Sequence, residues 1–121
     1  MNQRKAVLDS AKFLFSTHAS DILGSEQAIL SIVPGSGHGE DIWLRTESIH
    51  CIAEVTISGW NKRWTSVNPN TKKVIRAKLR HLSDCASATH RYIFVGNESI
   101  ASALRRRPES AAVSIQVVPQ E

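Results

Sequence analysis

The sequence contains few cysteines, no long apolar run and no internal repeat. Its two cysteines, Cys51 and Cys85, belong to no CxxC or paired Cys/His motif, so a structural zinc site is not expected. No apolar stretch approaches the ~20 residues that a membrane-spanning helix needs. Asp9 and Lys12 interrupt the apolar residues near the N-terminus, so we expect no export signal. We therefore predict a cytoplasmic chain with reduced thiols and no membrane partner.

The chain also carries little excess charge of either sign. Fifteen Lys and Arg residues against eleven Asp and Glu residues give a formal net charge of +4. With 41% hydrophobic and 21% charged residues, the composition excludes wholesale disorder, and 121 residues predict one domain, residues 1–121. The positive balance favours a polyanionic partner such as nucleic acid, although a solvated basic surface would have the same charge.

The order of apolar patterns predicts an α/β fold. Helices are expected over residues 4–16, 68–83 and 99–107, and strands over residues 28–33, 41–44, 48–57, 91–95 and 113–118. A glycine-rich segment, residues 34–39, predicts a tight turn between the first two strands. The order predicts a central mixed β-sheet flanked by helices, with a parallel crossover from residues 48–57 to residues 91–95.

Two of these elements carry the clearest patterns. In residues 48–57 the apolar side chains alternate, so that Glu54 is expected on the face opposite Val55. In residues 68–83, Asn68 and Pro69 are typical of an N-cap and a first helical position. The expected buried face of that helix consists of Val74, Ile75, Leu79 and Leu82.

A pair of acidic residues is the first candidate for chemistry. Asp41 begins one predicted strand and Glu54 lies inside the next, and one hairpin register brings both to the same end of the sheet. An acid within a strand is unfavourable by propensity and costly to bury without a partner. A hard cation such as Mg²⁺ relieves the repulsion between two carboxylates. Residue types alone favour a plainer interpretation, in which Glu54 faces solvent or binds an arginine.

The surroundings of the acids add cations and aromatic rings. The loop over residues 58–67 holds two tryptophans, Trp60 and Trp64, together with Lys62 and Arg63. Such a mixture is suited to stacking on bases and holding phosphates, but a tryptophan that caps the core beside solvated cations explains it equally well. The candidate nucleic-acid-binding residues are Lys62, Arg63, Lys72, Lys73 and Arg76.

Residues 39–95 resemble the restriction-endonuclease-like nucleases, the PD-(D/E)xK superfamily. Gly39-Glu40-Asp41 matches the acid that opens the second strand of that family, and Ala53-Glu54-Val55-Thr56 matches the acid-x-Lys triplet of the third. The resemblance implies a restriction-endonuclease-like αβββαβ core. It also implies that Asp41, Glu54 and the carbonyl of Val55 bind Mg²⁺ or Mn²⁺, and that the enzyme hydrolyses phosphodiester bonds in nucleic acid, with DNA as the expected substrate.

The sequence departs from the family at the lysine. Thr56 stands in that position, and the missing lysine would orient the attacking water and stabilise charge on the scissile phosphate. Lys62, Lys72 and Arg76 are the candidate substitutes, and we predict Lys72 as the catalytic cation because its helix follows this strand. The alternative is a catalytically inactive nuclease-fold module that binds nucleic acid or a protein partner. A small partner-binding or homodimerising protein without a nucleic-acid role is a third hypothesis.

Overall fold

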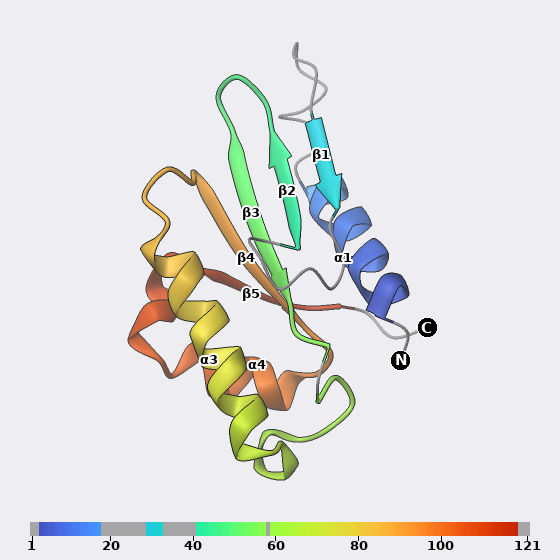
Figure 1. Ribbon diagram of the computed structural model, residues 1–121, viewed down its shortest axis with the longest axis vertical. Helices are drawn as coiled ribbons and strands as arrows, with labels where there is room; N and C mark the ends of the chain where they lie inside the picture. The colour runs from blue at the N-terminus through green and yellow to red at the C-terminus, as the bar shows by residue number, and fades with distance from the viewer. Residues whose placement is uncertain (1–2, 18–28, 33–40, 58, 119–121) are drawn as a thin grey trace.

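The computed structural model describes residues 3–17, 29–32, 41–57 and 59–118, with side chains from residue 5 onward except in residues 29–32 (Figure 1). Its strands are β1 (Ile29–Ile32), β2 (Ile42–Arg45), β3 (His50–Val55), β4 (His90–Val95) and β5 (Ser114–Val117). Its helices are α1 (Gln3–Thr17), α3 (Pro69–Asp84) and α4 (Glu98–Arg105), with short 3₁₀ turns η1 (Trp64–Ser66) and η2 (Pro108–Ala112). None of the helices in these ranges has the length and apolar character to cross a membrane. The turn expected over residues 34–39 lies outside the described residues.

The five strands form one mixed sheet in the order β1-β2-β3-β4-β5. The pairs β1–β2 and β2–β3 are antiparallel, and the pairs β3–β4 and β4–β5 are parallel. Helix α3 connects β3 to β4, as a parallel pair requires a crossover. The predicted α/β class, the mixed sheet with flanking helices and the antiparallel meander are therefore confirmed.

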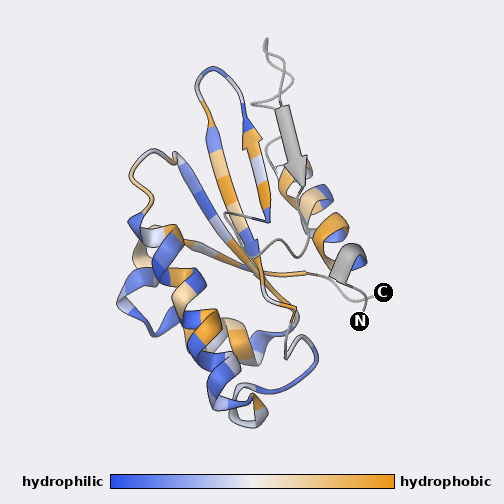
Figure 2. Ribbon diagram, viewed as in Figure 1, coloured by the Kyte–Doolittle hydropathy of each residue, from blue (hydrophilic) through white to orange (hydrophobic). Residues whose placement is uncertain are grey.

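The helices lie on both faces of the sheet (Figure 1). One buried cluster joins α1 to the sheet through Leu14, Ile42 and Phe94, and the other joins α3 and α4 to it through Leu79, Ile93 and Leu104. Successive residues of β4 alternate between the clusters, since Phe94 belongs to the first and Ile93 to the second. Figure 2 shows the resulting apolar strands at the centre of the molecule.

Strand β3 divides its side chains between these clusters as the sequence predicts. Cys51, Ala53 and Val55 are buried on the α1 side, and Ile52 is buried on the α3 side. Glu54 is two residues from Ile52, so it shares the face that α3 covers. An acidic residue is thus placed inside the layer between the sheet and a helix, with only 5% of its surface exposed.

Helix α3 begins where the sequence predicts and buries most of the expected face. The Asn68 side chain accepts a hydrogen bond from the Asn70 amide, 2.8 Å, and Pro69 is the first helical residue. Ile75, Leu79 and Leu82 are buried, but the expectation that Val74 belongs to the core is wrong, because it is 55% exposed. One helical step of about 100° from Ile75 turns Val74 past the edge of the contact with the sheet.

The loop between β3 and α3 is fixed at its buried tryptophan. Trp60 packs in the core, so of the two interpretations of this loop the structure supports a core tryptophan at position 60. A Cβ atom on Gly96 would lie 2.1 Å from the Trp60 carbonyl oxygen, so the close approach requires glycine there. The side-chain Nδ2 of Asn97 donates to the carbonyls of Trp60 and Lys62, at 3.0 and 2.9 Å. These contacts hold the loop against the end of β4 and the start of α4 (Glu98–Arg105), whose N-cap is Asn97.

The two sides of α3 predict different stability effects. Leu79→Ala should lower the free energy of unfolding by about 2–5 kcal/mol, because it leaves a cavity between helix and sheet. Val74→Ala should change it by less than about 0.5 kcal/mol, as for an exposed site. Urea unfolding followed by circular dichroism measures both, and equal losses would contradict the assignment of the two faces.

Candidate active site

The register of β2 on β3 brings the two acidic residues together. Ile42 is paired with Ala53, so continuing the antiparallel register by one residue sets Asp41 opposite Glu54. Residues directly opposite each other in a sheet project to the same face. Both carboxylates therefore lie on the α3 side, at the carboxyl end of β3, and the predicted hairpin register for this pair is confirmed.

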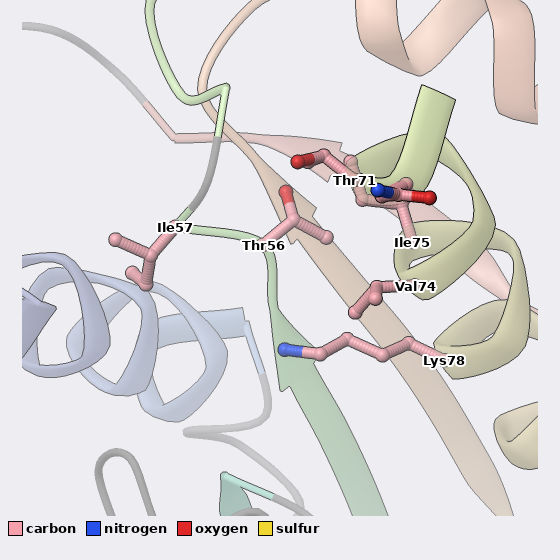
Figure 3. Close-up of a pocket in the computed structure, with 7 residues that line it drawn as sticks. Thr56, Ile57, Thr71, Val74, Ile75 and Lys78 are labelled. Carbon is pink, nitrogen blue, oxygen red and sulfur yellow. The ribbon is translucent and has the colours of Figure 1, made fainter. Parts of the chain in front are cut away.

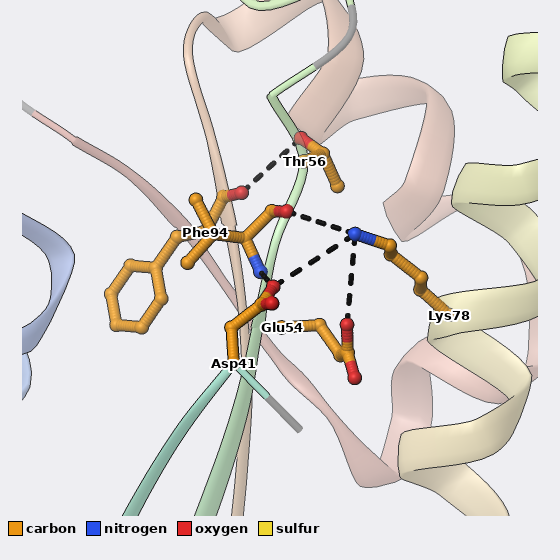
Figure 4. Close-up of polar contacts among 6 residues, drawn as sticks. Asp41, Glu54, Thr56, Lys78 and Phe94 are labelled. Carbon is orange, nitrogen blue, oxygen red and sulfur yellow. Dashed lines mark hydrogen bonds and ion pairs between the residues drawn. The ribbon is translucent and has the colours of Figure 1, made fainter. Parts of the chain in front are cut away.

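Asp41 is fixed to the backbone of β3. Its Oδ2 accepts a hydrogen bond from the Val55 amide at 2.8 Å (Figure 4). The residue is only 8% exposed, and it comes directly before β2. The Asp41 carboxylate thus takes the place of a backbone acceptor for the Val55 amide. This hydrogen bond to the strand sets the orientation of the carboxylate.

Lys78 of α3 completes the arrangement. Its Nζ donates a hydrogen bond to the Val55 carbonyl at 3.0 Å and lies 3.8 Å from Asp41 Oδ2 and 3.7 Å from Glu54 Oε2 (Figure 4). Charge-assisted hydrogen bonds between ammonium and carboxylate groups are about 2.7–2.9 Å long, so both ion pairs are looser than that. Lys78 is therefore near both acids while its hydrogen bond is made to the backbone.

Two carboxylates and one ammonium meet at this point, and both acids are buried. Charges in such surroundings interact more strongly than in water, because the local dielectric is lower. A cation placed between the two acids would therefore interact with them more strongly than with a pair of acids at the surface.

The donor atoms fit a hard divalent cation. Two carboxylates and the Val55 carbonyl are all oxygen donors, the type that Mg²⁺ and Mn²⁺ prefer. Across the described ranges, no group of three or more His, Cys, Asp or Glu side chains is placed to hold one ion. Mg²⁺ is commonly bound by one or two carboxylates with water and substrate phosphates as the other ligands, so two acids are sufficient.

The lysine predicted for this site is elsewhere. Lys72 lies with its Nζ 5.2 Å from the centre of the Trp64 ring, a cation–π contact. Lys72 and Lys78 are six residues apart at about 100° each, which places them about 120° apart around the helix axis. The two lysines therefore point in different directions. Lys78, which the sequence reasoning missed, is the lysine that the structure brings to Asp41 and Glu54.

The other predicted nucleic-acid contacts are not gathered at the acids. Lys62, Arg63 and Lys73 are exposed, and Arg76 is half-buried. Lys62 and Arg63 belong to the loop before η1, whereas Lys73 and Arg76 lie on the side of α3 that carries Lys72 rather than Lys78. They remain candidate contacts for a long polyanion, but none of them is a substitute for the missing strand lysine by position.

The sequence spacing places Lys78 beside the buried face of its helix. It is three residues after Ile75 and four before Leu82, both of which are buried. A residue at these spacings borders the apolar stripe, and a long side chain there can extend along the sheet with its charge at the rim. Lys72 borders the other side of the same stripe, three residues before Ile75 and seven before Leu79, so the spacing alone does not choose between the two lysines.

The contacts of Thr56 are structural. Its amide and its hydroxyl both donate to the Phe94 carbonyl, at 3.0 and 3.2 Å, and the residue is buried. The side chain that stands where the family has lysine thus continues the contact between β3 and β4 beyond the last paired residue. Its short length leaves the region in front of it to the side chains of α3.

Comparisons of this chain with protein-family models, with curated proteins and with solved structures find no match. The interpretation of the site therefore rests on its own geometry.

The hydrogen bond from Val55 to Asp41 predicts an asymmetric response to substitution. Asp41→Ala leaves a buried amide without its acceptor, so it should lower the free energy of unfolding by about 1–3 kcal/mol. Asp41→Asn keeps a side-chain oxygen in place and should stay within about 1 kcal/mol of the wild type. Urea unfolding of the two variants compares them, and an Asn variant as unstable as the Ala variant would contradict this role.

Proposed function

We propose that this protein is a divalent-metal-dependent nuclease that hydrolyses phosphodiester bonds in nucleic acid, with DNA as the expected substrate. The observation that carries the proposal is the convergence of Asp41, Glu54 and Lys78 around the Val55 backbone. The order of elements, a helix, an antiparallel three-strand meander, a helix and a parallel strand, supports a restriction-endonuclease-like core.

The proposed metal ligands are Asp41, Glu54 and the Val55 carbonyl, holding Mg²⁺ or Mn²⁺. When bound, such an ion supplies a Lewis acid that polarises a phosphate oxygen and lowers the pKa of a bound water. Glu54 lies within β3 and Asp41 directly precedes the adjacent strand β2, so the pairing of these two strands brings the carboxylates together. The Val55 amide keeps the Asp41 carboxylate in one orientation.

Lys78 takes the role that the resemblance assigns to the lysine missing at position 56. In hydrolysis a water oxygen forms a bond to phosphorus while the bond from phosphorus to the leaving oxygen breaks, and the leaving oxygen gains a proton. Negative charge builds on the phosphate oxygens during this step. The Lys78 ammonium lies among the same three oxygens that would hold the ion, so binding of the ion would displace it from the Val55 carbonyl. From a position beside the ion the ammonium could donate to the phosphate oxygens.

The presence of Lys78 favours an active enzyme over an inactive nuclease-fold module. The inactive alternative was motivated by the neutral Thr56, which left the site without a cation. A lysine from α3 lies within 4 Å of both carboxylates, so the set of two acids and one ammonium is present. The difference from the family pattern is the element from which the cation comes.

Cleavage by the wild type should require both acids and a divalent ion. We expect plasmid and linear DNA to be cut in Mg²⁺ or Mn²⁺ and to remain intact with Asp41→Asn/Glu54→Gln, which keeps the shape of both side chains. Calorimetric titration of Mn²⁺ should show binding to the wild type and a loss of binding to the double variant. Equal nicking by both proteins would refute the proposal, and salt-dependent DNA binding without cleavage would support the inactive alternative.

The role of Lys78 predicts a contrast between two lysines of one helix. Lys78→Met should lower the cleavage rate by about 10²–10³, as for the loss of one donor to the transition state, and Lys72→Met should leave it within a few fold. Thr56→Lys in the Lys78→Met background should restore part of the activity, because residues 54 and 56 project to the same face of the strand.

Single-turnover cleavage of a labelled duplex measures the four proteins. Urea unfolding provides the control that Lys78→Met remains folded. A Lys78→Met enzyme that is folded and as fast as the wild type would contradict a catalytic role for this lysine.

A further inference from the structure

A cavity of about 350 Å³ lies beside Lys78, between β3 and α3 (Figure 3). Its walls come from the two residues that follow β3, Thr56 and Ile57, and from α3, with Asn70, Thr71, Val74, Ile75 and Lys78. Lys78 belongs both to this wall and to the site, since its Nζ lies near Asp41 and Glu54. A molecule in the cavity would therefore be in contact with the group that we propose to stabilise the phosphate.

The exposed Val74 is explained by this cavity. The helical spacing places Thr71, Val74 and Lys78 on one face, and all three line the space. Val74 is an aliphatic side chain that is 55% exposed, and it faces the opening rather than the core. An apolar wall beside hydroxyl and amide groups is the composition of a ligand pocket.

The short side chain at position 56 is what keeps the space open. The Thr56 hydroxyl is tied to the Phe94 carbonyl, so it does not extend into the cavity to bond there. A lysine at this position would project from the same backbone toward the region that the cavity occupies. Supplying the cation from α3 instead of β3 thus leaves room beside the site.

The size and the lining of the cavity define its occupant. Ligand pockets begin at about 300 Å³, so this one accommodates a single small unit rather than a length of duplex. A nucleotide has an apolar sugar and base face that suits Val74, polar edges that suit Asn70 and Thr71, and a phosphate that suits Lys78. A base can enter such a space only when it is not stacked and paired in a helix.

We infer that this cavity holds one unpaired nucleotide next to the scissile phosphate, so that the preferred substrate of the proposed nuclease is single-stranded nucleic acid rather than uniform duplex. The inference rests on the proposed function for its substrate class. It adds a preference for single-stranded substrate. It also adds Val74 as a residue that determines specificity, apart from the two carboxylates.

Binding tests the inference separately from cleavage. The probes are a fluorescein-labelled oligothymidylate of about 12 nucleotides and a duplex of the same length. Fluorescence anisotropy is measured at low salt in Ca²⁺, a cation that oxygen donors also bind, with a gel to verify that the probes stay intact. Val74→Trp fills the cavity, and Asn70→Trp does so from a second position. Ala77→Trp is the matched control, because Ala77 is exposed on α3 and does not line the space.

We expect the wild type to bind the single strand more tightly than the duplex. Val74→Trp and Asn70→Trp should each weaken single-strand binding by about tenfold, and Ala77→Trp should leave it unchanged. Wild-type affinity in both cavity variants, tighter binding of the duplex, or no binding of the single strand would overturn the inference.

The failure of the inference and that of the proposed function are distinguishable. Cleavage that depends on Asp41 and Glu54 but is indifferent to Val74→Trp would refute the nucleotide site and leave the nuclease. Single-strand binding that depends on Val74, without cleavage in Mg²⁺ or Mn²⁺, would refute the nuclease and leave the nucleotide site.

Discussion

The two carboxylates at the carboxyl end of β3 can share one buried face because the Lys78 ammonium lies between 3 and 4 Å from both and is itself held by the Val55 carbonyl. Removing two acids from water without a partner costs several kcal/mol for each ion, so the pairing of β2 with β3 and the docking of α3 have to occur together. The position of α3 on the sheet is thereby coupled to the electrostatics of the site. The contacts of Trp60 with Gly96 and Asn97 hold the loop that leads from β3 to α3 against the start of α4.

The cations of α3 are divided between two faces of the helix with different surroundings. Lys78 borders the buried stripe and reaches the acids, whereas Lys72 lies over Trp64 on another side. The net charge of +4 is a sum over the whole chain, so it does not distinguish the two faces of α3. Long-range attraction of a polyanion would depend on all of these cations, but chemistry at the acids would depend on Lys78.

The site and the cavity beside it have one structural origin. Thr56 completes the contact with β4 through the Phe94 carbonyl and is too short to reach the acids. The cation then comes from the helix, and the space that a strand lysine would fill remains beside Val74 and Thr71.

The sequence by itself determined the local elements and much of their order. The alternation in residues 48–57 and the Asn68-Pro69 helix start depend on neighbours in the chain, and so does the placement of Glu54 opposite Val55. The tertiary structure decided which cation meets the acids. Lys72 and Lys78 lie about 120° apart around the helix axis, so the rotation of α3 against the sheet determines which of them faces the carboxylates. It also decided that Val74 faces a cavity rather than the core. Both outcomes depend on how α3 is rotated and docked against the sheet, and that rotation is set by contacts between residues far apart in the chain.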